Sequence, residues 1–189
     1  MANKDAAFGL KALGKVGQNR DNQGLSEYSI AASATAIYQW DKVEMLNTGT
    51  IGVAAAGDVL LGSLNGVFYT DASTSKPTWA NHLAASNTAT DIVGFVADDP
   101  YERFEVQSNN SGASAQTDVG NNADIAYTAG ATPNYISKVE LDDSTLAATT
   151  AQLKIVGVSK DPDNSDLTAA NVNWVVTINE HFLKQTAGI

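Results

Sequence analysis

Cysteine is absent from this sequence of 189 residues, which excludes disulfide bonds, thiolate metal ligands and a cysteine nucleophile. Packing, hydrogen bonding or assembly must therefore stabilise the fold. Histidine is almost as scarce: only His82 and His181 are present, and they lie too far apart in the chain to form a metal-ligand motif. We expect no metal site built on histidine and no bound cofactor.

Positive charge is also scarce. The chain has 11 Lys and Arg against 21 Asp and Glu, which gives a formal net charge of −10. Because phosphate binding needs a clustered basic face, we do not expect nucleic acid as a partner. No stretch approaches the ~20 apolar residues of a membrane span, and residues 1–5 lack the apolar core of a signal peptide. We expect a soluble protein that does not bind a membrane.

Complete catalytic motifs are missing as well. Residues 9–16 match the letters of a phosphate-binding loop, but Val16 stands where a hydroxyl should reach Mg²⁺, and no strand precedes the match. Residues 161–166 resemble the start of a calcium loop, but Asp166 replaces the required glycine and Val172 the bidentate glutamate. A capped turn and a simpler surface cation site both stay open there. No G-x-S-x-G nucleophile elbow occurs, so we expect a protein that is not an enzyme.

The strongest positive signal is for β structure. In residues 91–107, two runs rich in β-branched and aromatic side chains flank an acidic segment with Pro100, a pattern typical of a β-hairpin. Residues 153–162 repeat its Ile-Val-Gly and Asp-Pro pattern, and residues 172–178 supply a returning strand. The repeat predicts either two related β modules or two matching hairpins within one barrel.

Further segments favour strands and turns. Residues 28–40 alternate with a period of two, which favours a strand. Asn65 and Gly66 form the best tight-turn signal, because both tolerate positive φ. Residues 124–128 and 135–141 indicate another hairpin.

Helical signals are few. Residues 77–85 form the one modest helix candidate, and residues 142–150 fit a connection or a single helical turn. Residues 108–122 read as a polar loop. We therefore predict an all-β (mainly β) chain, built as small β-barrel or β-sandwich modules.

The leading residues 1–24 differ from the rest, since glycines alternate there with basic residues and apolar periodicity is slight. We predict an extended N-terminal arm that pairs with an acidic neighbour, with a frayed terminus as the alternative. Residues 25–189 would form the β-rich body, either as one unit or as two related halves, 25–110 and 111–189. The arm residues expected to bind a partner are Lys4, Phe8, Leu10, Lys11, Leu13, Lys15 and Arg20.

Several single residues are of types that can take part in catalysis or binding. Asp98 and Asp99 should point to opposite faces of a strand, so they cannot act as an acid and base pair unless a turn redirects one. His181 is expected to end a strand as a hydrogen-bonded surface residue. The tryptophans and tyrosines could be buried in the core, as aromatic residues on strands usually are, or they could form a sugar-binding face.

Taken together, the arm, the small β modules, the acidity and the lack of catalytic motifs resemble the structural head proteins of tailed bacteriophages. The resemblance is to their decoration, or cement, proteins, which bind the outside of the mature capsid. It lies in three stretches: Ala-Gly-Asp-Val-Leu at 56–60, Val-Gly-Phe-Val at 93–96 and Asn-Trp-Val-Val-Thr-Ile-Asn-Glu-His at 173–181.

This resemblance implies a viral structural protein with no cofactor, made in the host cytoplasm and located on the outer capsid surface of the virion. It implies the major capsid protein as partner and self-association into a homotrimer that clamps neighbouring coat subunits. The arm, residues 1–24, would lie along the coat protein. The alternative function is a tail, baseplate or fibre module of the virion that binds a host glycan through exposed tryptophans.

Overall fold

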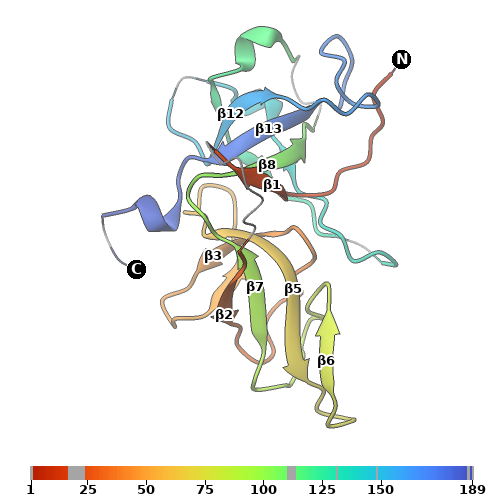
Figure 1. Ribbon diagram of the computed structural model, residues 1–189, viewed down its shortest axis with the longest axis vertical. Helices are drawn as coiled ribbons and strands as arrows, with labels where there is room; N and C mark the ends of the chain where they lie inside the picture. The colour runs from red at the N-terminus through yellow and green to blue at the C-terminus, as the bar shows by residue number, and fades with distance from the viewer. Residues whose placement is uncertain are drawn as a thin grey trace.

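The computed structural model describes residues 2–16, 24–109, 114–130, 132–147, 149–186 and 188. Strands account for 38% of the chain, and the helical pieces among the described residues are short 3-10 turns, which confirms the prediction of an all-β fold. Figure 1 shows two antiparallel sheets, one above the other, as two modules of an elongated molecule. No helix in the described ranges has the length and hydrophobicity needed to cross a membrane.

The upper module in Figure 1 is built on a five-stranded sheet. Apolar side chains such as Phe104, Ile155 and Trp174 alternate with polar ones along its strands, so one face of the sheet is buried. Ile125 and Leu141 of a two-stranded ribbon pack into the same core. In spatial order the sheet contains β1 (Lys11–Lys15), β8 (Glu102–Gln107), β13 (Asn173–Ile178), β12 (Leu153–Val158) and β9 (Asn122–Ala123), and the ribbon contains β10 (Ile125–Ala126) and β11 (Glu140–Leu141).

The lower module is built on a six-stranded sheet with a separate core. Val43, Leu64, Val67 and Val96 are fully buried in this core, and Phe182 packs against it from the 3-10 turn η3 (Phe182–Lys184) near the C-terminus. The strands in spatial order are β2 (Ser26–Ser29), β7 (Val93–Ala97), β5 (Gly62–Thr70), β3 (Lys42–Met45) and β4 (Ile51–Val53), with β6 (Pro77–Ala80) also paired to β5.

Two predicted hairpins are confirmed. β12 pairs antiparallel with β13, as the Ile-Val-Gly strand and its returning partner predicted. β10 pairs antiparallel with β11, within the segments 124–128 and 135–141. The single helical turn considered in residues 142–150 is η2 (Asp143–Thr145).

The hairpin predicted over residues 91–107 is wrong. β7 pairs with β2 and β5, whereas β8 pairs with β1 and β13, so the connection between β7 and β8 passes from one sheet to the other. β7 and β8 therefore have two partners each, but they do not pair with each other. β8 precedes residue 110 but lies in the same sheet as β12 and β13, which follow it. The division between the two sheets therefore does not fall at residue 110. A relationship between the halves 25–110 and 111–189 stays a prediction.

Two local signals in the lower module are overridden by packing. The strand predicted over residues 28–40 is not continuous, because β2 ends at Ser29 and only isolated bridges follow at Ile37 and Gln39. The helix predicted over residues 77–85 is also wrong. Its first part is strand β6, which lies along β5 and so extends the sheet.

The tight turn predicted at Asn65 and Gly66 is wrong too. Both residues lie inside β5, at an irregularity in its register with β7. Gly66 serves close packing there: a Cβ atom at this position would lie 2.7 Å from the Trp79 ring. The Trp79 ring on the neighbouring strand β6 therefore explains why residue 66 is a glycine. The residues next to Gly66 in the sequence do not indicate this contact.

Candidate interaction surfaces

Side-chain amides hold the first residues of the arm to the upper module. The Gln107 carboxamide donates to the Lys4 carbonyl oxygen at 2.9 Å and accepts from the Ala6 amide at 2.8 Å. The Asn164 Nδ2 donates to the same Lys4 carbonyl at 2.8 Å. The described part of the arm thus lies along its own body, as Figure 1 shows for the chain between the N-terminus and β1.

The loop 161–166 is a capped turn. Asp161 Oδ1 accepts from the Asp163 amide at 3.0 Å, and Asp166 Oδ1 accepts from the Thr168 amide at 2.9 Å. Asp163 also forms an exposed ion pair with Lys4 of the arm. Within the ranges that the structure describes, no group of three or more His, Asp or Glu side chains could hold a metal ion. The geometry supports the capped turn over a surface cation site.

The middle of the arm belongs to the fold itself. Leu10 is fully buried in the upper core, and its amide donates to the Trp40 carbonyl oxygen at 2.9 Å. Phe8 is half-buried and meets the Trp40 ring edge-on, with ring centroids 6.5 Å apart. Leu10 is therefore unavailable to a partner while β1 is in place, and deletion of residues 1–24 would remove a core residue as well as an arm.

The remaining arm residues lie in or beside β1. Lys15 pairs with Asp99 at 2.7 Å, Lys11 lies 3.6 Å from Glu105, and Leu13 is 41% exposed. Arg20 lies outside the described residues. Residues 9–16, which match a phosphate-binding loop by letter, end in this strand and not in a loop that opens a helix, so the motif lacks its structural context.

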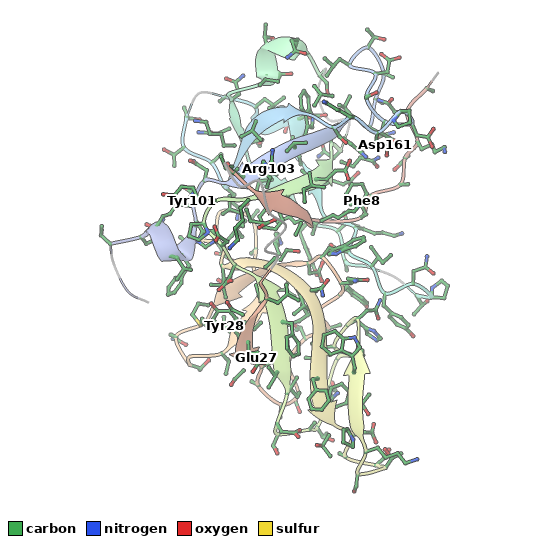
Figure 2. The ribbon with its side chains drawn as sticks, viewed as in Figure 1. Phe8, Glu27, Tyr28, Tyr101, Arg103 and Asp161 are labelled. Carbon is green, nitrogen blue, oxygen red and sulfur yellow. The ribbon has the colours of Figure 1, made fainter. Side chains whose placement is uncertain are left out.

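The outer face of the five-stranded sheet carries cations around exposed apolar side chains. Lys11, Leu13, Arg103, Lys160 and Val175 border one shallow groove of about 500 Å³, together with the acidic Glu105 and Asp161. Figure 2 shows Arg103 and Asp161 on this module. Next along β12, Lys154 and Val156 are also exposed. We call this surface the basic face and define it by Lys11, Leu13, Arg103, Lys154, Val156, Lys160 and Val175.

The sequence did not reveal the basic face, because its residues come from β1, from β8 and from the hairpin of β12 and β13 with the residues after β12, three regions that are far apart in the chain. Lys11 lies opposite Glu105 on β8, and Glu105 lies opposite Val175 on β13. Only the exposed alternation of Lys154 and Val156 could have indicated it locally. In a chain with a net charge of −10, such a local excess of cations is a distinct feature.

The outer face of the six-stranded sheet carries aromatic side chains. Trp79 on β6 lies opposite Phe68 on β5, and the two are 54% and 41% exposed. The Trp79 ring also meets Phe95 on β7, with ring centroids 4.9 Å apart. We call Phe68, Trp79 and Phe95 the aromatic face. Trp174, by contrast, is fully buried, so the tryptophans divide between core and surface.

Asp98 and Asp99 lie between β7 and β8, not in a strand, and they have separate partners. Asp98 accepts from the Tyr28 hydroxyl at 2.6 Å, and burial together with this hydrogen bond raises the pKa of Tyr28. Asp99 instead pairs with Lys15 and accepts from the Tyr101 amide at 2.8 Å. Asp98 therefore contacts β2 of the lower module, whereas Asp99 contacts β1 of the upper module. The two carboxylates do not form an acid and base pair.

The prediction of a surface position for His181 is wrong. The residue is fully buried, and its bridge to Leu60 brings the C-terminal segment onto the lower module. Its Nδ1 accepts from the Leu183 amide at 3.1 Å, so it caps the turn η3. Burial, helped by the nearby charge of Lys184, lowers the pKa of His181 to about 4. Its neighbours Asn179 and Glu180 are polar, so no local pattern indicates this burial.

Comparison of the chain with protein-family models, with curated proteins and with solved structures found no match. Its function must therefore be argued from its surfaces and from the resemblance of its sequence.

Proposed function

We propose that this protein is a capsid decoration, or cement, protein of a tailed bacteriophage. It binds the outer surface of the capsid, contacts the major capsid protein and stabilises the coat lattice, and it self-associates as a homotrimer. The observation that carries the proposal is the basic face, where cations of the predicted arm join apolar side chains on one exposed sheet surface. Exposed apolar patches with polar rims are typical of protein interaction sites.

The buried position of Leu10 changes how the arm would act. β1 stays in the sheet, and its outward side chains Lys11 and Leu13 contact the coat together with Arg103 and Val156. Residues 2–8 are held mainly by hydrogen bonds to side-chain amides and by one exposed ion pair, so they can exchange these contacts for others on a coat subunit. Several copies bound to a repeating lattice convert a modest contact into lasting attachment by avidity.

The test is co-sedimentation with capsids assembled from the major capsid protein of the same particle. We expect Leu13→Asp to weaken capsid binding about tenfold or more, because it places a carboxylate in an apolar contact. Leu183→Asp is the matched control, since Leu183 is 52% exposed on the turn η3 and is not part of the basic face. It should bind as the wild type does. Failure of the wild type to sediment with capsids, or equal binding by both variants, would contradict the proposal.

The aromatic face supports one second candidate, a tail, baseplate or fibre module that binds a host glycan. Trp79 is more than half exposed on a sheet surface, and aromatic rings in this position can stack on sugars. In that case a glycan array should give a signal that Trp79→Ala abolishes. Tyr101→Ala is the control, because Tyr101 is 65% exposed away from this face. A silent array with the wild type would count against glycan binding.

A further inference from the structure

A cavity of about 230 Å³ lies where the two modules meet. Lys11, Ala12 and Glu102 line it from the upper module, and Trp40, Asn65 and Ala97 line it from the lower module. The Lys11 ammonium itself lies 3.6 Å from Glu105 on the outer face of the sheet. Its volume is below the roughly 300–1,000 Å³ of sites for drug-sized ligands, so it suits a small molecule or one amino-acid side chain.

Glu102 is the acidic group in the wall of this cavity. The residue is only 3% exposed, on the same side of β8 as the core residues Phe104 and Val106. Its Oε1 has no hydrogen-bond partner in the part of the chain that the structure describes. A buried carboxylate oxygen without a partner is costly, and native proteins rarely leave one in place.

The surroundings of Glu102 supply only partial compensation. Burial raises the pKa of Glu102, while a hydrogen bond from the Gly14 backbone and the charges of Lys15 and Arg103 act in the opposite direction. Lys15, however, is engaged with Asp99 at 2.7 Å. Among the residues that the structure describes, the carboxylate therefore has no direct cationic partner.

We propose that the cavity between the modules binds an alkylammonium group, which donates hydrogen bonds to Glu102 while its carbon chain lies against Trp40, Ala12 and Ala97. An N–H cation matches both the charge and the unfilled acceptor of Glu102. An indole in the wall also favours a cation, through the electrostatic attraction of its ring face. The group can come from a free small amine or from a lysine side chain of a partner, and the chemistry is the same in both cases. This site is independent of capsid binding.

The test uses n-butylammonium chloride and the peptide acetyl-Gly-Lys-Gly-amide, each titrated into the full chain at pH 7. The readout is the NMR shift of the Trp40 indole N–H. For so small a ligand we expect a Kd on the order of 1 mM. Binding of n-butylammonium assigns the site to free amines as well as side chains, whereas binding of the peptide alone assigns it to a lysine of a partner.

Two controls make the result specific. Neutral n-butanol should not shift the Trp40 signal, because it lacks the charge. Glu102→Gln should weaken binding at least tenfold, whereas Glu27→Gln, an exposed glutamate on β2, should leave it unchanged. The site would be refuted if neither amine binds at 20 times the expected Kd, if n-butanol binds as well as the amine, or if Glu102→Gln keeps the wild-type affinity. The n-butanol comparison decides the matter even if Glu102→Gln does not fold.

Discussion

Replacement of Gly62 by alanine is expected to destabilise the protein by about 3 kcal/mol or more, or to prevent folding. A Cβ atom at this position would lie 2.2 Å from the carbonyl oxygen of Ala97 and 2.9 Å from its carbonyl carbon. Both are backbone atoms, so no side chain can rotate away. β5 and β7 would have to separate at the point where Ser63 pairs with Ala97.

The same change should damage the contact between the modules. Ser63, the next residue, donates from its hydroxyl to the Leu10 carbonyl oxygen at 2.5 Å and so joins β5 to the arm. Urea unfolding of both variants at pH 7 measures the effect. Gly157→Ala is the matched control, because Gly157 also lies in a strand but, apart from its chain neighbours, no described residue has an atom within 4 Å of an added Cβ. It should change the free energy of unfolding by less than about 1 kcal/mol. Equal stability of the two variants would show that the contact at Gly62 is not as tight as described.

The sequence predicted those elements whose partners are close in the chain. The hairpin of β12 and β13 was predictable because both strands alternate regularly and pair directly with each other. The ribbon of β10 and β11 was predictable for the same reason. In each case the local pattern and the tertiary pairing agree, so the local signal was sufficient.

The sequence failed where a distant strand decides the local structure. Asn65 and Gly66 favour a turn, but the Trp79 ring packs over Gly66 and β7 continues alongside. Around Pro100 the signal for a chain reversal was strong, yet β7 and β8 each find two partners in different sheets. Local propensity cannot report such pairings, because they depend on residues that are far away in the chain.

The candidate surfaces likewise combine features that the local sequence predicts with features that depend on distant residues. The glycines and lysines of residues 1–24 predict an extended arm, but no local pattern indicates that Leu10 enters the core or that residues 11–15 form strand β1. The basic face and the cavity at Glu102 are both assembled from strands distant in sequence. Glu102 sits in a strand of alternating character, and the carboxylate falls on the core side only because β8 pairs as it does with β1 and β13.

Acid is expected to destabilise the protein through His181. The pKa of this buried imidazole is about 4, because burial disfavours the charged form, whereas in an unfolded chain it is near the ordinary value of 6.5. Between these two pH values the unfolded state binds the proton and the folded state does not. The free energy of unfolding therefore falls as the pH is lowered from about 6.5 to 4, and the full effect is about 3 kcal/mol.

The variant His181→Asn isolates this contribution. Asparagine also accepts a hydrogen bond at the start of a helical turn, so it can replace Nδ1 as acceptor for the Leu183 amide, but it does not titrate. Urea unfolding at pH 7 and pH 4.5 should show a loss of stability that is about 2 kcal/mol smaller in the variant than in the wild type. His82→Asn is the control, because His82 is only half-buried and should leave most of the pH dependence in place. Buried acids such as Asp41 have a raised pKa and so act in the opposite direction, but their effect is common to all three proteins and cancels in the comparison. The same pH dependence in wild type and His181→Asn would mean that the imidazole is already protonated, or open to water, in the folded protein.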